Sequence, residues 1–242
     1  MKNNLEFYDQ SAADWWQPNT KIYALYYLNE PRFRFFDRYV SWQGLRALDV
    51  GCGGGFSCEF LANKGVEVFG IDQSLKCIMK AQEHANTSGL QIDYKCCLAE
   101  ALPYQDSYFD VVVCVDVLEH VNNVSKVIQE IHRVLKPQGM FFFDTINRTF
   151  KSKLVMIWLL ENILRQIPCG IHDWEKFIKP EELFYLLEKQ GFNNIEIAGF
   201  DPFGKTLLEH IDAYLYYKKF GGFQVKITEE TSVMYIGKAT KQ

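Results

Sequence analysis

Glycines and carboxylates follow two successive predicted strands in a pattern that suits a nucleotide cofactor. The sequence DVGCGGG, residues 49–55, separates an apolar strand from a helix, and Asp72 closes the next strand. Glycines let the chain turn sharply and leave backbone N–H groups at the helix start open to a ligand. A carboxylate at the end of the following strand can accept hydrogen bonds from both hydroxyls of a ribose. We therefore expect cofactor contacts from Asp49, Gly51, Gly53, Gly55 and Asp72.

The spacing of the glycines favours one cofactor over another. The dinucleotide fingerprint G-x-G-x-x-G needs its third glycine where this chain has Phe56, which is too bulky for the close helix packing involved. The pattern D-x-G-x-G-x-G from Asp49 resembles the first motif of class I S-adenosylmethionine (SAM) methyltransferases. That resemblance implies that the leading acid and the loop hold the methionine end of SAM, while Asp72 holds the ribose. A tight turn without a ligand is the alternative.

A second group of reactive side chains consists of Asp116, Glu119 and His120, which follow an apolar strand. If a helix begins there, all three lie on neighbouring faces of one turn. Two carboxylates and an imidazole can hold a divalent metal, and oxygen ligands suit Mg²⁺. Alternatively, His120 alone, with an ordinary pKa of about 6.5, can act as the general base for a phenol. Ordinary helix capping by acidic residues is the third possibility.

Strand and helix patterns alternate along the chain, which indicates an α/β fold with a doubly wound parallel sheet. The expected strands are 46–50, 66–71, 92–96, 109–115 and 140–143, with more after residue 194; the expected helices are 56–64, 74–86, 124–135, 154–167 and 180–190. Ligands bind at the carboxyl ends of such strands, where the glycine loop, Asp72, Ala99 and Asp116 should converge. The SAM motif implies the Rossmann-like class I methyltransferase fold, a mostly parallel seven-stranded sheet with helices on both faces.

Nothing in the 242 residues demands more than a single domain, 1–242. We expect a helical N-terminal cover over residues 1–44, an inserted amphipathic or lid segment over 150–178, and C-terminal strands over 200–242. The stretch 207–219 is rich in Tyr and Leu and looks like an addition to those strands. It could form a wall of the substrate site or an oligomer contact.

The segment from Leu154 to Ile167 is apolar at helical spacing and is flanked by Lys151, Lys153 and Arg165. It is too short to span a bilayer, which takes about 20 residues. Such a helix can lie in a membrane interface with its basic groups toward anionic headgroups. A substrate lid or a core helix packed on the sheet is an equally good interpretation.

Composition limits the partners and the compartment. The formal net charge of −4 argues against nucleic acid as the main partner. The seven cysteines are odd in number and contain no C-x-x-C pair, so reduced thiols are expected rather than disulfides or a thiolate zinc site. Residues 1–14 contain no apolar segment of a secretory signal. We expect a cytoplasmic protein, either free or peripheral on the inner face of a membrane.

Several motifs together resemble the ubiquinone-biosynthesis O-methyltransferases, and the similarity runs from about residue 9 to residue 199. They are Trp15-Trp16, Asn29-Glu30-Pro31-Arg32, the glycine loop, 115–121, the D-T-I-N-R-T segment 144–149 and the segment 170–180, which contains H-D-x-x-K-F-I-K-P. The last two are far more restrictive than the cofactor loop. The resemblance implies methylation of a catechol or phenol hydroxyl of a polyprenylated quinone precursor, with SAM as methyl donor.

The same resemblance implies roles for individual residues. Arg32, Gly51, Asp72 and Val115 would contact SAM, and Asp116, Glu119 and His120 match the family's divalent-metal cluster. Where the family usually has Glu, this chain has the shorter Asp116. The helix 154–167 matches a membrane-associating insertion. The sequence is also compatible with two other functions: a methyltransferase of a small soluble phenol or carboxylate, and a non-catalytic SAM-binding protein.

Overall fold

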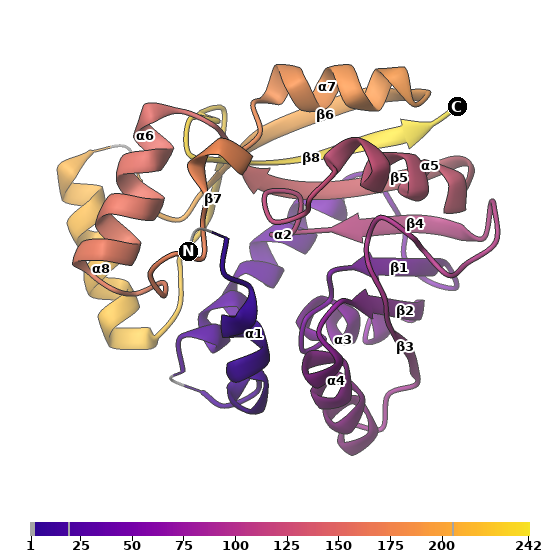
Figure 1. Cartoon of the computed structure of the whole chain (residues 1–242), viewed down its shortest axis with the longest axis horizontal. Helices are drawn as coiled ribbons and strands as arrows, with labels where there is room; N and C mark the ends of the chain where they lie inside the picture. The colour runs from indigo at the N-terminus through magenta and orange to yellow at the C-terminus, as the bar shows by residue number, and fades with distance from the viewer. Residues whose placement is uncertain (1–2, 19, 205) are drawn as a thin grey trace.

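A twisted sheet with helices on both faces organises the chain (Figure 1). The computed structural model describes residues 3–18, 20–204 and 206–242. Its sheet has the strand order β3-β2-β1-β4-β5-β8-β6-β7. The first five of these strands are parallel, whereas β8 runs antiparallel to both of its neighbours and β7 antiparallel to β6. This is the mixed, mostly parallel arrangement expected from the alternating pattern.

The sheet contains eight strands in the described part of the chain, so the expectation of seven is corrected. The strands are β1 (Arg46–Val50), β2 (Glu67–Asp72), β3 (Ile92–Cys96), β4 (Phe109–Cys114), β5 (Leu135–Ile146), β6 (Phe192–Asp201), β7 (Lys226–Thr228) and β8 (Met234–Lys241). The additional strand is β7, which pairs with residues 199–201 at the open edge of the sheet. Three partly exposed residues carry too little pattern to be distinguished from a loop.

The helices include those predicted from apolar periodicity at 56–64, 74–86, 124–135, 154–167 and 180–190, with boundaries shifted by a few residues, together with helices in the N-terminal segment and one at 207–220, where no helix was predicted. They are α1 (Glu6–Gln10), η1 (Ala12–Asp14), η2 (Ile22–Leu28), α2 (Asn29–Phe36), α3 (Phe56–Ala62), α4 (Leu75–Thr87), α5 (Val124–Val134), α6 (Phe150–Ser152), η3 (Lys153–Ile163), η4 (Trp174–Lys176), α7 (Pro180–Lys189) and α8 (Leu207–Phe220). Ser74 and Asn123 cap α4 and α5 with their side chains. Such caps satisfy N–H groups that the first turn leaves free.

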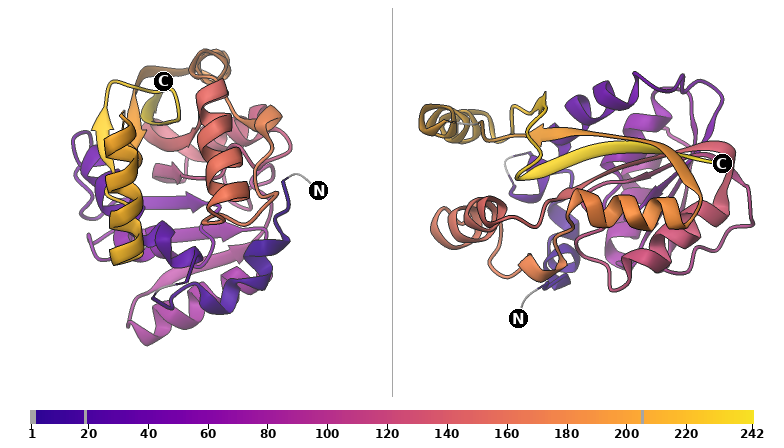
Figure 2. Two further views of the ribbon diagram at one scale, coloured as in Figure 1. Left: turned by 90° about the vertical axis from the view of Figure 1, so that its left-hand side faces the viewer. Right: turned by 90° about the horizontal axis from the view of Figure 1, so that it is seen from above.

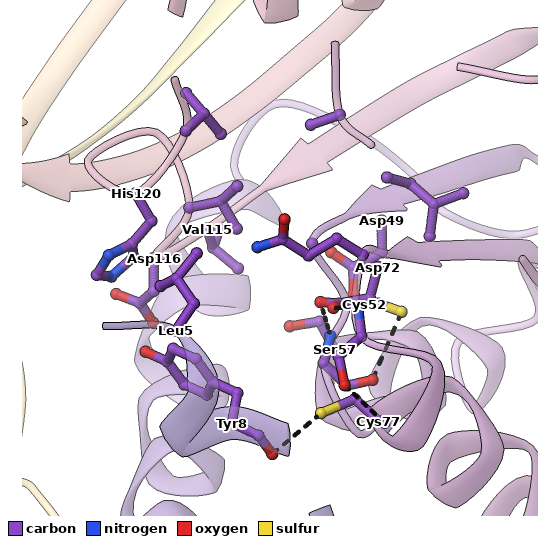
Figure 3. A pocket seen from close by; sticks show the side chains of 18 of the residues that line it. Leu5, Tyr8, Asp49, Cys52, Ser57, Asp72, Cys77, Val115, Asp116 and His120 are labelled. Carbon is purple, nitrogen blue, oxygen red and sulfur yellow. Dashed lines mark hydrogen bonds between the residues drawn. The ribbon is translucent and has the colours of Figure 1, made fainter. Parts of the chain in front are cut away.

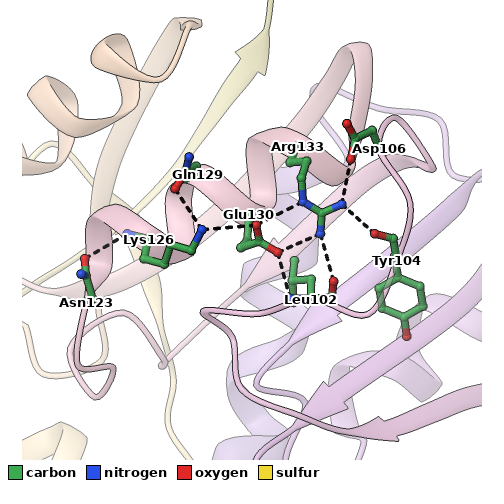
Figure 4. Close-up of polar contacts among 8 residues, drawn as sticks. All are labelled: Leu102, Tyr104, Asp106, Asn123, Lys126, Gln129, Glu130 and Arg133. Carbon is green, nitrogen blue, oxygen red and sulfur yellow. Dashed lines mark hydrogen bonds and ion pairs between the residues drawn. The ribbon is translucent and has the colours of Figure 1, made fainter.

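A polar cluster on α5 anchors the loop that follows β3 (Figure 4). The guanidinium of Arg133 donates to the carbonyl oxygens of Leu102 and Tyr104, at 2.9 and 2.7 Å. Glu130 accepts a hydrogen bond from the Leu102 N–H at 3.0 Å and also pairs with Arg133. Because these contacts fix the loop close after residue 100, they help to place Ala99 at the carboxyl edge of the sheet.

The inserted segment forms a wide helix beyond the end of the sheet. One α-turn, α6, leads into the eleven-residue π-helix η3, a form that is rare in proteins. Only Met156, Leu160 and Glu161 of η3 are buried. The added stretch is also helical, as α8, and both helices project from the same end of the molecule (Figure 2). They flank a small apolar cavity of about 60 Å³.

Candidate active site

A cavity of about 560 Å³ opens at the carboxyl ends of β1, β2 and β4. Figure 3 shows Asp49 and Asp72 on one side of it, and Asp116 and His120 on the other. The predicted site residues that line this cavity are Arg32, Asp49, Gly51, Gly53, Asp72, Ala99, Val115, Asp116 and His120. Tertiary structure therefore brings most of the two predicted groups to one cavity, while Gly55 and Glu119 are not among its lining residues.

Asp72 holds the glycine loop in position. Its carboxylate accepts hydrogen bonds from the N–H of Gly53 at 2.9 Å and of Ser74 at 2.8 Å. Each carboxylate oxygen has a second lone pair, so Asp72 can still accept from ligand hydroxyls. At Gly51 the backbone φ is +76°, and a Cβ atom would lie 2.3 Å from the Val117 side chain. Only glycine therefore fits at this point of the loop.

Gly55 has a packing role in this structure. It precedes α3 with φ of +93°, and a Cβ atom there would lie 2.5 Å from the Tyr94 hydroxyl oxygen. The expected direct contact between Gly55 and the cofactor is therefore not supported by its position. The close approach of Tyr94 therefore explains why the fourth glycine of the loop is needed at this position.

Buried polar atoms without partners mark the cofactor side of the cavity. Asp49 is buried, and one of its carboxylate oxygens accepts from the Cys58 thiol at 3.3 Å. The other oxygen, and the indole N–H of Trp15, have no hydrogen-bond partner among the described residues. Burial raises the pKa of Asp49 to about 7. Unpaired buried polar groups are costly, so an acceptor and a donor at a cavity wall fit a polar ligand.

Arg32 connects distant parts of the chain beneath the cavity. Its guanidinium lies 2.5 Å from a carboxylate oxygen of Asp144 on β5 and 2.6 Å from one of Asp116. Arg32 and Asp144 are buried, and two carboxylates compensate the desolvated charge of one arginine. Its charge is therefore committed to these partners, although Arg32 also lines the cavity as expected for a cofactor contact.

The segment 116–120 forms a turn, so the helical arrangement considered for these three residues does not occur. Asp116 has φ of +56°, and its N–H donates to Asp144 at 2.8 Å. The carboxylate of Asp116 pairs with Arg32, that of Glu119 accepts from the Thr145 hydroxyl at 2.7 Å, and His120 Nδ1 contacts Asn3 at 3.0 Å. No three acidic, histidine or cysteine side chains of the described residues group as metal ligands. As arranged here, these three donors do not fit a divalent metal.

Burial shifts the two remaining titratable groups in opposite directions. It raises the pKa of Glu119 to about 8, assisted by the nearby Asp116. It lowers the pKa of His120 to about 3, assisted by the charges of His172 and Lys176. Both groups are therefore uncharged near neutral pH. An uncharged imidazole can accept a proton, whereas a protonated carboxyl group cannot.

Two residues of the restrictive H-D-x-x-K motif, His172 and Lys176, contact His120 on the side away from the cavity. The His172 ring stacks on the His120 ring with centroids 5.5 Å apart, and its Nδ1 lies 2.7 Å from Glu161 of η3. Lys176 Nζ donates to the backbone oxygen of His120 at 3.1 Å. These residues position the histidine without lining the cavity themselves, which explains why the motif accompanies the 115–121 segment.

The N-terminal segment contributes residues to which the sequence assigned no role in the site. Asn3, Tyr8 and Trp15 line the cavity, and the Trp16 indole N–H donates to Gly54 O at 2.7 Å. A cover over residues 1–44 was expected, although Met1, Lys2 and Asn19 lie outside the described residues. Helical periodicity predicts that a segment packs on the body, but it does not indicate which of its side chains reach a distant cavity.

Comparison with known proteins places this site in a class. Residues 48–143 match a family described as methyltransferase domain. A SAM-dependent methyltransferase of Thermotoga maritima superposes with a TM-score of 0.67 at 15% identity, over 98% of this chain and 99% of that one. Another, from Aquifex aeolicus, gives 0.65 at 16% identity, over 97% and 98%. The glycine loop and the fold are together those of a class I SAM-dependent methyltransferase.

Curated relatives define the family more narrowly. A ubiquinone biosynthesis O-methyltransferase of Pelagibacter ubique is 34% identical over 99% of this chain and 98% of its own length. Relatives with the same name from Coxiella burnetii and Ruegeria pomeroyi are 37% and 39% identical, over 82% and 80% of this chain and 85% and 83% of their own. The chain belongs to the family of ubiquinone biosynthesis O-methyltransferases and is a SAM-dependent methyltransferase.

Proposed function

We propose that this enzyme transfers a methyl group from SAM to a catechol or phenol hydroxyl of a polyprenylated quinone precursor. The names of its relatives support the substrate class. The observation that carries the proposal is one cavity with Asp49 and Asp72, the carboxylates expected to bind SAM, on one side and an uncharged histidine, His120, on the other.

His120 offers an unprotonated ring nitrogen to the cavity. The Asn3 amide nitrogen donates to His120 O at 3.0 Å, so the amide oxygen faces Nδ1 and the proton of the ring lies on that nitrogen. Nε2 is then the acceptor. A phenol has a pKa of about 10 and is a weak nucleophile until it is deprotonated. We assign His120 Nε2 as the base that takes the proton of the acceptor hydroxyl.

The other residues hold the reactants. Asp72 receives the ribose hydroxyls, and Asp49 with the loop from Gly51 to Gly53 receives the methionine end. When bound, SAM supplies a methyl group activated by the positive charge on its sulfur. Holding two reactants in attack geometry is worth about 7–11 kcal/mol in favourable cases, so positioning contributes much of the rate. No metal takes part in this proposal, because Arg32 and Thr145 already engage the carboxylates of Asp116 and Glu119.

Turnover with a catechol tests this function. We expect the purified enzyme to convert SAM and 3,4-dihydroxybenzoate, or a prenylated catechol, to S-adenosylhomocysteine and a methyl ether. His120→Gln should lower kcat about 100- to 10,000-fold, as expected for loss of a general base, with SAM affinity retained. His132→Gln on α5, which lies outside the cavity, is the control. Absence of methyl ether formation by the wild type, or full activity of His120→Gln, would contradict the proposal.

Peripheral contact with an anionic membrane through residues 154–167 is the second part of the proposal. No helix among the described residues is long and apolar enough to span a membrane. Leu154, Trp158 and Ile163 are 41, 58 and 51% exposed. Transfer of these side chains from water into the membrane interface would be favourable, which supports membrane contact at this surface. Exposed Leu208 and Leu215 of the neighbouring α8 support a broader apolar surface at this end. Such contact would bring the cavity near a prenylated acceptor.

A further inference from the structure

Tyr8 of α1 reaches into the cavity beside the proposed base. Its ring stands edge-on to the His120 ring, with centroids 6.2 Å apart and planes at 75°. On its other side it contacts Trp15, also at 6.2 Å. Figure 3 shows the Tyr8 hydroxyl directed toward Asp116 and His120. The phenol group therefore lies on the acceptor side of the cavity.

Several contacts hold α1 in place, so the position of Tyr8 is defined by the fold. The Cys77 thiol donates to Tyr8 O at 3.5 Å, and the Ser74 hydroxyl donates to the next residue, Asp9. Immediately before α1, the Asn4 N–H donates to Gly170 O at 2.9 Å. These bonds attach the helix to α4 on one side and to the His172 loop on the other.

The Tyr8 hydroxyl is a hydrogen-bond donor without a partner among the described residues. It makes no hydrogen bond to any side chain or backbone group in the described ranges, although it faces polar surroundings. Burial, and then the carboxylates of Asp116, Glu119 and Asp72, raise the pKa of Tyr8 well above its usual value. The hydroxyl therefore stays protonated, while neighbouring His120 is uncharged and has one ring nitrogen without a proton. A hydrogen-bond donor, Tyr8, and the proposed base, His120, therefore lie next to each other in the cavity wall.

We propose that the Tyr8 hydroxyl donates a hydrogen bond to the second oxygen of a catechol acceptor, the one adjacent to the hydroxyl that His120 deprotonates. This assignment rests on the proposed function and adds a selectivity determinant to it. A vicinal diol satisfies both residues, whereas a monophenol leaves the Tyr8 hydroxyl without a partner. A buried polar group left unpaired discriminates strongly against such an analogue.

Tyr8→Phe tests the assignment, because it removes one oxygen and keeps the ring. With saturating SAM, kcat/KM for 3,4-dihydroxybenzoate should fall about 10- to 100-fold, in keeping with loss of one hydrogen bond to a polar ligand. Binding of the same catechol to the S-adenosylhomocysteine complex should weaken in parallel. Binding of 4-hydroxybenzoate should not weaken, and SAM affinity and the melting temperature should stay unchanged. Tyr185→Phe on the exposed face of α7 is the matched control.

The possible outcomes separate this assignment from the proposed function. Equal catechol affinity and turnover in wild type and Tyr8→Phe would overturn the role of the hydroxyl alone. Loss of SAM affinity in Tyr8→Phe, with the preference for catechol over 4-hydroxybenzoate intact, would overturn it in favour of a cofactor contact. Failure of the wild type to methylate any catechol contradicts the proposed function. In that case, the affinities of wild type and Tyr8→Phe for catechol, measured on their S-adenosylhomocysteine complexes, still test the role of the Tyr8 hydroxyl.

Discussion

Single residues of the site owe their properties to burial. Glu119 is buried and pairs with no cation among the described residues, so its charged form is disfavoured even though the Thr145 hydroxyl donates to its carboxylate. His120, held by Asn3 on one side and stacked on His172 on the other, is disfavoured in its charged form too. Charge in the site is concentrated where Arg32 meets Asp116 and Asp144. Beside this ion pair, His120 presents an uncharged ring to the cavity.

Glu119→Gln should change how stability depends on pH. The folded protein raises the pKa of Glu119 to about 8, so it keeps a proton that the unfolded chain loses above about pH 4.5. Stability from this group is therefore present at low pH and is lost as the pH rises toward about 8. The Gln variant lacks this loss, and its advantage over wild type should grow by up to about 1.4 kcal/mol per pH unit in that window.

Urea unfolding at pH 5, 6, 7 and 8 measures this difference. Gln retains the oxygen that accepts from Thr145, so the comparison isolates ionisation. Asp49, whose pKa is also raised to about 7, contributes equally to both proteins and cancels. Glu188→Gln on the exposed face of α7 is the control. Stability curves that run parallel for wild type and Glu119→Gln would refute a raised pKa.

At the scale of elements, a few buried polar contacts supplement the apolar packing of the helices against the strands. Arg32 joins α2 to β5 and to the turn at 116. Glu161, a buried residue of η3, accepts from the N–H groups of Gly170 and His172 at 2.8 and 3.0 Å. The inserted helix is therefore bonded to the loop that carries His172, and through that ring it contacts His120.

Arg32→Met should destabilise the protein much more than Arg34→Met. Removing Arg32 leaves the buried carboxylate of Asp144 unpaired, and breaking a buried pair in this way costs about 3–5 kcal/mol. Arg34 pairs with Glu30 on the exposed side of the same helix, where such pairs contribute about 0–1 kcal/mol. Chemical denaturation at one pH compares them. Equal losses in the two variants would mean that the buried network does not hold α2 to the sheet.

At the scale of the whole molecule, apolar exposure is concentrated at the end formed by η3 and α8 (Figures 1 and 2). Ile157 is partly buried against the core, so Trp158 and Ile163 are better positions for a test. Lys153 and Arg165 lie exposed beside them. This surface combines apolar anchors with basic groups, the composition of helices that bind a membrane interface.

Trp158→Glu with Ile163→Glu should release the protein from liposomes. Wild type should sediment with vesicles containing anionic phosphatidylglycerol, bind less at high salt and ignore neutral vesicles, because each basic residue near an anionic surface contributes about 1 kcal/mol. SAM affinity should survive the double substitution. Met79→Glu on α4, 64% exposed and far from both helices, is the control. If the wild type does not bind anionic vesicles, the segment 154–167 is better interpreted as a substrate lid.

The sequence by itself determined the local chemistry and the order of the elements. The glycine loop and Asp72 are recognisable because a turn of this kind depends on backbone freedom within a few residues. The buried strand β4 shows as an uninterrupted β-branched run because both of its faces are covered. The helix from Pro180 starts as predicted because proline and two acids suit a first helical turn.

Only the tertiary structure decided how the reactive side chains are oriented. Asp116 adopts a left-handed conformation because of Asp144, 28 residues away, so the three residues predicted as a metal cluster point to different partners. Asn3 reaches His120 across 117 residues, and no spacing rule predicts such a contact. Tyr8 likewise becomes part of the cavity only when α1 packs against α4. Burial, which sets the pKa of Glu119 and His120, depends on the packing of the entire chain.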